Sequence, residues 1–254
     1  MEHDSVLCVR KLHKEFATKD QGRAVAVDDV SFCVHAGESV ALVGGSGCGK
    51  STTARMIARL TDCTSGEVWL NGQDVTHVRG SAQRALYTHL QMVFQNPVGS
   101  FDPRRTLGHG IEEPLRNTGA GKAEARAKAL LTLEQCGLNA SFADRYPHEV
   151  SGGQCQRAAI ARALVSEPEL IICDEATSAL DVTVQAQIVQ TLADIQRSRG
   201  LALLFICHDL ALVQGFCDRV LVMHAGRIVE EGPTAMVLSH PQHEYTKQLV
   251  NAAR

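Results

Sequence analysis

The sequence predicts an α/β protein with a core of parallel strands and helices, an antiparallel β layer near the N-terminus and an inserted α-helical subdomain. Three short apolar runs, at residues 38–44, 169–176 and 201–209, have the length and composition of buried strands. Residues 49–60 follow the first run with helical periodicity, and the helical pattern at 182–200 lies between the other two. Strands that alternate with helices in this way form parallel sheets joined by right-handed crossovers.

The remaining segments complete the predicted organisation. Valine-rich stretches within residues 1–35 predict the antiparallel layer, and residues 219–232 predict a hairpin around Ala225 and Gly226. Residues 122–138 predict a helix within the insert, and residues 240–254 predict a turn followed by a short surface helix. We expect a single domain, residues 1–254, divided into an α/β core at 1–95 and 158–232, a helical subdomain at 96–157 and a short C-terminal extension at 233–254.

The composition limits the class of protein. A hydrophobic content of 44% and a charged content of 21% are typical of a globular chain, and a net charge of −3 gives no electrostatic reason for a nucleic-acid partner. The nine cysteines form no C-x-x-C pair and no zinc-finger spacing, so we expect reduced thiols in a cytosolic compartment. No N-terminal signal is visible, and the longest apolar stretch is interrupted by His208 and Asp209. We therefore expect any role at a membrane to come through a partner.

A glycine-rich loop joins the first apolar run to its helix. It fits the phosphate-binding pattern G-x-x-x-x-G-K-[ST] with Gly44, Gly45, Ser46, Gly47, Cys48, Gly49, Lys50 and Ser51, and Thr52 follows directly. Glycines let backbone N–H groups wrap phosphates at a helix N-terminus, where the helix dipole favours negative charge. Lys50 can reach the β- and γ-phosphates, and the Ser51 hydroxyl can ligate Mg²⁺. The alternative is a glycine-rich turn that binds no ligand. Within the proteins that have such a loop, the absence of an N-K-x-D motif from the sequence disfavours a GTPase.

Acidic residues at the end of the second apolar run point to hydrolysis. Asp174 ends this run, where its carboxylate can hold Mg²⁺ through water, and Glu175 beside it can polarise an attacking water. The alternative is a solvated Asp-Glu pair at a strand end, which the preceding phosphate loop disfavours. These two residues therefore narrow the phosphate chemistry from transfer to hydrolysis.

Single residues near other strand ends are further candidates. Gln95 ends a short apolar run and could contact Mg²⁺ or the water. His208 ends the third run, although a lone histidine in that position is more often structural. Phe16 could stack on adenine or be an ordinary buried phenylalanine. A second glycine motif, VSGGQ at residues 150–154, opens a helix and also suits an anion, in a chain that already has a phosphate loop.

Taken together, these motifs resemble the ATP-binding subunit of an ABC transporter over nearly the whole chain. They occur in the family's order: Phe16 as the adenine-stacking aromatic, residues 44–52 as Walker A, Gln95 as the Q-loop, residues 150–154 as the signature, Asp174 and Glu175 as Walker B, Asp181 in the D-loop and His208 as the H-loop. The resemblance implies a P-loop NTPase (RecA-like) core, with ATP and Mg²⁺ as cofactors. Val150, Ala176 and Cys207 differ from the commonest family residues without removing a functional group.

The resemblance also implies roles for individual residues. Two subunits face head to tail in this family and sandwich each ATP between them. Glu175, His208 and Gln95 would then act in catalysis, and Ser51, Gln95 and Asp174 would hold the metal. The signature residues would close over the partner's nucleotide, with Asp181 at the same interface: Ser151, Gly152, Gly153 and Gln154.

Within the family the chain is similar to importers of dipeptides, oligopeptides and nickel. Residues 91–106 and 173–189 are similar to that group's Q-loop and Walker B regions, and residues 240–249 to the start of its C-terminal extension, with Glu244 in place of a proline. The resemblance implies an importer of peptides or nickel or metal-chelate complexes. The expected partners are a second, related but non-identical ATPase subunit, two transmembrane permease subunits and, indirectly, an extracytoplasmic substrate-binding protein. The expected location is peripheral, at the cytoplasmic face of the bacterial inner membrane.

Two other uses of such an ATPase are alternatives. A soluble accessory ABC ATPase of a metabolic enzyme complex, of the carbon–phosphorus lyase type, stays open, because subunits of that kind resemble the same group. ABC-type ATPases of DNA repair or chromosome maintenance need long coiled-coil or zinc-binding insertions, and the chain has neither.

Overall fold

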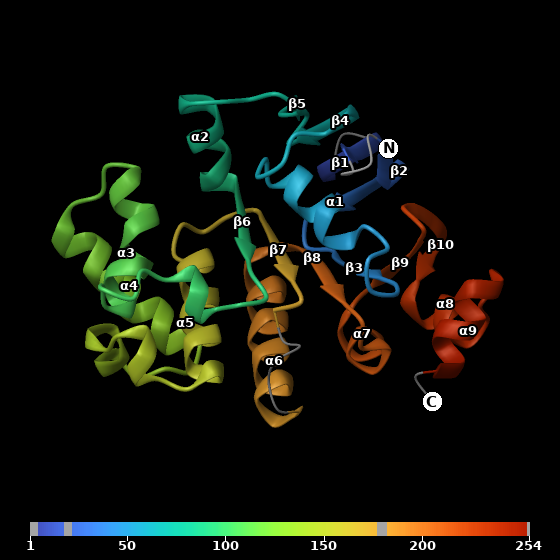
Figure 1. The fold of residues 1–254 in the computed structure, drawn as a ribbon. Coiled ribbons are helices and arrows are strands. Elements are labelled where there is room, and N and C mark those ends of the chain that lie inside the picture. The colour runs from blue at the N-terminus through green and yellow to red at the C-terminus, as the bar shows by residue number, and fades with distance from the viewer. Residues whose placement is uncertain (1–4, 18–21, 177–181, 253–254) are drawn as a thin grey trace.

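The computed structural model describes residues 5–17, 22–176 and 182–252, and within these ranges the chain forms two β-sheets flanked by helices (Figure 1). The strands are β1 Ser5–Ala17, β2 Arg23–His35, β3 Ser39–Val43, β4 Ser65–Leu70, β5 Gln73–Asp74, β6 Leu90–Val93, β7 Leu170–Asp174, β8 Ala202–Cys207, β9 Arg219–His224 and β10 Arg227–Pro233. The helices are α1 Lys50–Ile57, α2 Ser81–His89, α3 Leu107–Asn117, α4 Lys122–Gln135, α5 Gly152–Leu164, α6 Val182–Arg199, α7 Leu210–Phe216, α8 Thr234–Ser239 and α9 Glu244–Ala252, with 3₁₀ turns η1 Val98–Ser100, η2 Ala140–Asp144 and η3 Pro147–Glu149.

The larger sheet has the strand order β10-β9-β3-β8-β7-β6, and its pairs are parallel except for β9 with β10. Alternate side chains of each strand enter different cores, as the pleat of a strand requires. In β3, Ala41 and Val43 pack toward the helices α3 to α6, whereas Val40 and Leu42 pack toward α1 and the N-terminal strands. The parallel α/β core predicted from the apolar runs is confirmed.

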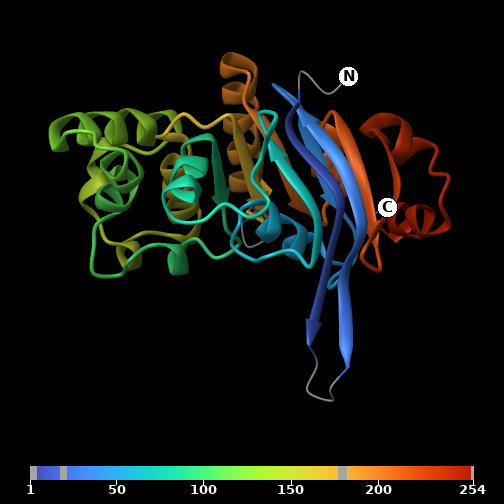
Figure 2. The same ribbon diagram turned by 90° about the horizontal axis from the view of Figure 1, so that it is seen from above.

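The smaller sheet is antiparallel and has the order β2-β1-β4-β5. Its long strands β1 and β2 form a ribbon that projects beyond the rest of the molecule (Figure 2). Their inward-facing residues, including Leu7, Leu12 and Val30, are fully buried against the core on the α1 side. The expected antiparallel layer is therefore present.

The cysteines correct one expectation. Cys8 of β1 and Cys33 of β2 form a disulfide, where the sequence spacing predicts reduced thiols throughout. The antiparallel register places these two residues directly opposite each other, with Cα atoms 4.2 Å apart. Spacing along the chain carries no information about such cross-strand neighbours. The other seven cysteines are free, and burial raises the pKa of the Cys173 and Cys207 thiols to about 12, as expected for cysteines that behave as small apolar residues.

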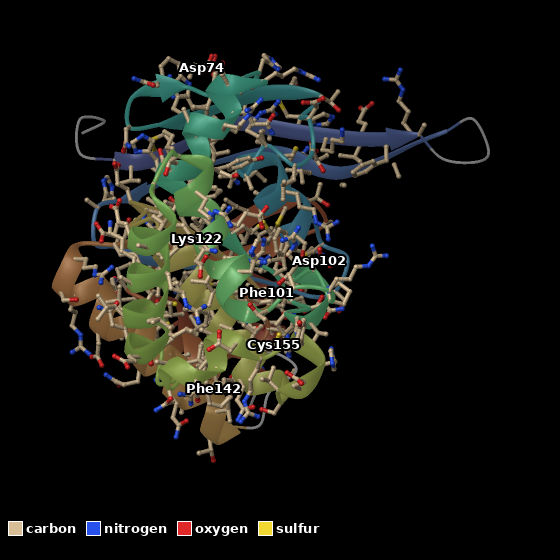
Figure 3. All side chains as sticks on the ribbon, turned by 90° about the vertical axis from the view of Figure 1, so that its left-hand side faces the viewer. Asp74, Phe101, Asp102, Lys122, Phe142 and Cys155 are labelled. Atoms are coloured by element: carbon tan, nitrogen blue, oxygen red, sulfur yellow. A yellow bond between two sulfur atoms is a disulfide. The ribbon has the colours of Figure 1, made fainter. Side chains whose placement is uncertain are left out.

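Helices α3, α4 and α5 form a group at the β6 end of the larger sheet (Figures 1 and 3). The expected helix at 122–138 is present as α4, whose Ala129 and Leu133 are fully buried beside Ile111 of α3 and Cys155 of α5. The helix that carries the VSGGQ motif continues to Leu164 and packs against β6. It therefore connects the helical group to the sheet.

The C-terminal part folds around the hairpin of β9 and β10. Ala225 and Gly226 both have positive φ, 46° and 85°, in the turn where the sequence predicts the hairpin. The expected terminal helix is α9, and a further helix, α8, precedes it without having been predicted. Both helices lie beside β10 (Figure 1).

Candidate nucleotide-binding site

The predicted site residues lie at the carboxyl ends of adjacent strands. The register aligns Val43 of β3 with Cys207 of β8, and Cys173 of β7 with Val93 of β6, so the strands β3, β8, β7 and β6 end at one edge of the sheet. The segments that follow these ends carry, in the same order, the glycine-rich loop, His208, the Asp174–Glu175 pair and Gln95. Ligands of open parallel sheets bind at this kind of edge.

Two glycines of the loop cannot carry a side chain. Gly49 has φ of 108°, and a Cβ there would lie 2.3 Å from the carbonyl oxygen of Ala26. A Cβ on Gly44 would lie 2.1 Å from the carbonyl oxygen of Met223. The loop is therefore pressed against β2 on one side and β9 on the other, which fixes its path into α1.

Lys50 is the first residue of α1 and is almost fully buried. Its ammonium group donates hydrogen bonds to the carbonyl oxygens of Gly44 (2.8 Å) and Gly45 (2.9 Å), and it lies 3.7 Å from the Cys48 sulfur. The lysine thus curls back into the loop and holds a positive charge at its centre. This is the position from which a lysine of a phosphate loop acts on phosphates.

Ser51 and Asp174 form a direct contact between α1 and β7. The Ser51 hydroxyl donates a hydrogen bond of 2.7 Å to Oδ1 of Asp174. Burial raises the pKa of the Asp174 carboxyl above its ordinary value, and the Ser51 hydrogen bond opposes that shift. A hydroxyl and a carboxylate so close together supply the hard oxygen ligands that Mg²⁺ prefers, so the pair fits this metal. Thr52 follows in the first turn of α1, half-buried.

Glu175 is tied to Gln95. Glu175 has φ of 48°, its backbone N–H donates to the carbonyl oxygen of Ile206 on the neighbouring strand, and its carboxylate Oε2 accepts a 2.7 Å hydrogen bond from Nε2 of Gln95. A non-glycine residue with positive φ is uncommon and is often found at functional sites. The structure therefore brings together the candidate base and the Q-loop glutamine.

The remaining candidates lie around this centre. The His208 side chain is exposed just beyond the end of β8. Phe16 is 44% exposed, which excludes an ordinary buried phenylalanine, and the Lys14 ammonium lies 5.0 Å from its ring centre. Phe16 pairs with Ala24 on β2, two residues before Ala26, whose carbonyl oxygen adjoins Gly49. The exposed ring thus extends from the strand next to the loop.

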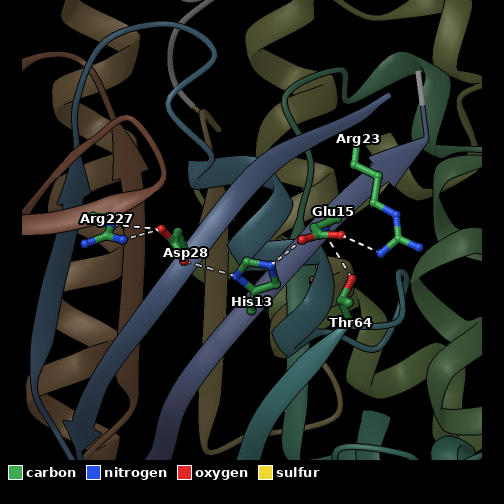
Figure 4. A network of polar contacts seen from close by, with 6 residues as sticks. All are labelled: His13, Glu15, Arg23, Asp28, Thr64 and Arg227. Atoms are coloured by element: carbon green, nitrogen blue, oxygen red, sulfur yellow. Dashed lines mark hydrogen bonds and ion pairs between the residues drawn. The ribbon is translucent and has the colours of Figure 1, made fainter. Parts of the chain in front are cut away.

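A polar network that no sequence motif indicates joins β1, β2 and β10 (Figure 4) and is connected to the loop through the backbone. Asp28 of β2 accepts hydrogen bonds from Arg227 of β10 (2.6 and 2.8 Å) and lies 3.2 Å from the His13 ring of β1. The Asp28 N–H donates to Gly226, and the Gly226 N–H donates to Cys48 in the loop. The contact between β2 and the β9–β10 turn leaves no local signal in the sequence, because Asp28 and Arg227 are 199 residues apart.

The signature residues lie apart from the loop. Ser151 caps α5: its hydroxyl accepts the Gln154 N–H, and the Gln154 side chain accepts the Ser151 N–H. Ser151 and Gly152 are exposed, and Gly153 is half-buried. Among the described residues no hydrogen bond joins 151–154 to 44–52. The helical group that holds this motif adjoins β6, three strands from β3, or about 14 Å at the usual strand spacing. Asp181 lies outside the described residues.

No helix among the described residues is long and apolar enough to cross a bilayer. No cluster of three or more His, Cys, Asp or Glu side chains there is arranged to hold a metal ion by itself.

The fold and the loop geometry define a P-loop nucleoside triphosphatase, and comparisons with known proteins narrow this class. Residues 27–178 match the family described as ABC transporter. The chain is 46% identical over 253 residues to the oligopeptide transport ATP-binding protein OppF of Bacillus subtilis, an alignment covering 98% of this chain and 82% of that protein. It is 49% identical to the glutathione import ATP-binding protein GsiA of Salmonella typhi over 89% of this chain, but spans only 37% of GsiA.

Solved structures agree with this. The dimeric ATP-binding cassette MJ0796 bound to ADP and Pi matches with a TM-score of 0.83 and 28% identity, over 90% of this chain and 98% of that chain. CbiO1 of Clostridium perfringens, part of an ABC transporter complex, matches with a TM-score of 0.81 and 26% identity, over 98% and 95% of the two chains. The chain therefore belongs to the ABC transporter family, as one of its ATP-binding cassettes. Its relatives OppF and GsiA are named as ATP-binding proteins, and the MJ0796 structure holds ADP and Pi.

Proposed function

We propose that this cassette hydrolyses ATP to power an importer of short peptides. The observation that carries the proposal is the convergence of Lys50, the Ser51–Asp174 pair and the Gln95–Glu175 pair at one edge of the parallel sheet. Relatives named for oligopeptide, peptide and glutathione transport support a peptide rather than a nickel cargo.

Each residue at this edge has a chemical role in the proposal. The backbone N–H groups of residues 44–52 and the Lys50 ammonium bind the phosphates, and Phe16 stacks on the adenine. Glu175 polarises the attacking water as general base, with His208 at the next strand end contacting the γ-phosphate. The Gln95 amide already donates to the Glu175 carboxylate and so positions it.

Magnesium fits the oxygen atoms gathered beside the loop. Ser51 and Gln95 would be direct ligands, and Asp174 would act through water. When bound, the ion would neutralise charge on the β- and γ-phosphates. The Ser51–Asp174 hydrogen bond of 2.7 Å holds these two groups next to each other before the ion binds.

The signature motif serves the nucleotide of a second cassette in this proposal. Ser151 and Gly152 are exposed at the start of α5, which packs against β6, whereas the chain's own loop follows β3, three strands away. Two cassettes facing head to tail would bring each signature onto the other's phosphates, so ATP would close the pair and hydrolysis would open it. The dimeric form of MJ0796 supports this arrangement. Asp181 would lie at the same interface.

A hollow beside the site is the proposed docking place for a permease. A cavity of about 590 Å³ is bordered by Ser51, Gln95 and Asp174 at one end and by Ser100 and Arg162 at the other. A second cavity of about 320 Å³ shares Gln91 and Arg162 with it and continues toward α2 and α3. Two permease subunits, a related second cassette and an extracytoplasmic binding protein would complete the importer. The chain would then lie at the cytoplasmic face of the inner membrane.

The hydrolysis role is tested with Glu175→Gln. This change removes the anionic base but keeps a side chain of the same shape, so ATP should still bind and the closed dimer should accumulate. Light scattering after size-exclusion chromatography measures the dimer, and phosphate release measures turnover. Glu134→Gln, an equivalent change at an exposed position of α4, is the control. Turnover of Glu175→Gln equal to that of the control would refute the assigned role.

The transport role is tested by affinity purification of the tagged chain from detergent-solubilised native membranes. Mass spectrometry should find two permease subunits and a second cassette. The associated binding protein should then bind short peptides rather than nickel chelates in calorimetry. Recovery with a soluble metabolic enzyme complex would instead support the accessory ATPase, and a nickel-specific binding protein would replace the peptide cargo.

A further inference from the structure

The C-terminal helix touches the phosphate loop directly. The hydroxyl oxygen of Tyr245, in the first turn of α9, accepts a 2.7 Å hydrogen bond from the backbone N–H of Gly45, 200 residues away in the sequence. The Tyr245 ring also lies against the His224 ring at the end of β9, with centroids 3.9 Å apart and planes tilted by 31°. The hydroxyl is therefore aimed at the loop by a ring contact on the hairpin that supports the loop.

The start of α9 is anchored to the sheet, which fixes the direction of the Tyr245 hydroxyl. Both carboxylate oxygens of Glu230, on β10, accept backbone N–H groups just before the helix, from Gln242 and His243 at 2.9 Å each. Thr246, the residue after the tyrosine, is fully buried. Tyr245 thus belongs to a segment anchored to the sheet, which lowers the entropy lost in making the loop contact.

Gly45 is suited to receive the hydroxyl. A Cβ at this position would lie 3.0 Å from the Tyr245 oxygen, a distance that would require the tyrosine to shift. On its other side, the Gly45 carbonyl accepts from the Lys50 ammonium at 2.9 Å and from the Cys48 N–H at 3.4 Å. Tyr245 and Lys50 therefore hold the same residue from opposite sides.

We propose that Tyr245 is a positioning residue that holds Gly45 of the phosphate loop in the conformation that binds ATP. This proposal rests on the proposed role of that loop. Lys50 has to exchange its contacts with the Gly44 and Gly45 carbonyls for phosphate oxygens when ATP binds. The Tyr245 contact is independent of that exchange and keeps Gly45 in place while it happens. The C-terminal segment thereby becomes part of what sets ATP affinity, although Tyr245 itself touches no phosphate.

The expected effect is on binding and not on the chemical step. Without the acceptor, the Gly45 N–H finds other partners, and the loop spends part of its time in conformations that do not bind. The apparent dissociation constant rises by the inverse of the competent fraction. The typical net contribution of one neutral hydrogen bond corresponds to a rise of about fivefold.

The test is Tyr245→Phe in the full chain, because phenylalanine keeps the ring contact with His224 and loses only the hydroxyl. Calorimetry should give a Kd for MgATP about fivefold higher, and steady-state hydrolysis should show KM raised by a similar factor with kcat within about twofold of wild type. Tyr87→Phe is the matched control, because the Tyr87 hydroxyl also accepts one hydrogen bond, from Gln83 on α2. The control should change neither constant.

A second variant distinguishes the loss of the Tyr245–Gly45 contact from a general loss of stability of the fold. Gly45→Ala places a methyl group against the tyrosine oxygen, so it should weaken MgATP binding in the wild-type background and add little in the Tyr245→Phe background. Equal Kd values for wild type and Tyr245→Phe, additive effects of the two changes, or a fall in kcat with KM unchanged would each overturn the proposal. A wild-type chain that binds no MgATP would refute the proposed function itself, and the nucleotide role of Tyr245 with it.

Discussion

Arg162 of α5 connects the signature helix to the segment after the Q-loop, and its replacement by lysine should be costly. Its guanidinium donates to both the carbonyl oxygen and the hydroxyl of Ser100, the latter at 2.9 Å, and lies 4.4 Å from the centre of the Phe101 ring. Lysine keeps the positive charge and nearly the same reach. It cannot hold two acceptors with one planar group or lay that plane on the ring.

The structure sets the size of the effect. Losing one charge-assisted hydrogen bond costs about 1.5–3 kcal/mol, and losing the contact with the aromatic ring costs about 0.5–2 kcal/mol. Together these predict a loss of about 3 kcal/mol in the free energy of unfolding. With an unfolding entropy of about 2.1 cal/mol/K per residue over the chain, Tm should fall by about 6 °C.

Urea denaturation and scanning calorimetry of Arg162→Lys measure this loss. Arg116→Lys is the matched control, because Arg116 is exposed at the end of α3, and it should stay within about 0.5 kcal/mol of wild type. If Arg162→Lys is as stable as the control, then the contacts between α5 and η1 contribute nothing net and the reasoning is wrong.

Other outcomes follow from features of the surface and of the N-terminal sheet. Ser151→Arg should leave ATP binding by the single chain intact and abolish the ATP-driven dimer in light scattering; normal dimers would refute the partner role of the signature. A thiol titration of denatured, unreduced protein should find seven free thiols, and nine would exclude the disulfide. Cys33→Ser should lower the free energy of unfolding by about 3.5 kcal/mol, because the disulfide closes a loop with a sequence separation of 25. The hydrogen bond from Arg227 lowers the pKa of the Asp28 carboxyl below its ordinary value of 3.8. The ionised Asp28 therefore stabilises the fold fully above pH 3.8, and this stabilisation is lost as the pH falls through the lower pKa of the folded state. Asp28→Asn should therefore show a shallower acid transition in circular dichroism, and identical transitions would count against that contribution.

The parallel sheet and the residues at its edge were predictable because their signals are local. A buried parallel strand is a short apolar run, so Leu170–Asp174 and Ala202–Cys207 stand out in the sequence, and the polar residue that ends each run is placed by the strand itself. The glycine-rich loop is a contiguous motif for the same reason. Once the strands are parallel and adjacent, Glu175 and Gln95 must meet at one edge, and the structure joins them by a hydrogen bond.

The contacts that the sequence did not reveal are those between distant segments. Tyr245 lies in a segment whose sequence signal is its resemblance to the start of the importer group's C-terminal extension. Its hydroxyl meets Gly45 because β10 returns the chain to the sheet. The Cys8–Cys33 pair depends on a β1–β2 register with several irregularities, which spacing cannot provide. Helix α8 has only six residues, too few to show a periodicity.

The short segment between Gln95 and Ser100 is fastened at both of its ends. One end is held to the Glu175 carboxylate and the other to Arg162 of α5, and Gln95, Ser100 and Arg162 all border the same hollow. Six residues span at most about 20 Å when fully extended, and the turn at η1 shortens that reach. We therefore expect a displacement of α5 relative to the sheet to strain one of these two contacts, because the segment connects the helical group to the Glu175 carboxylate.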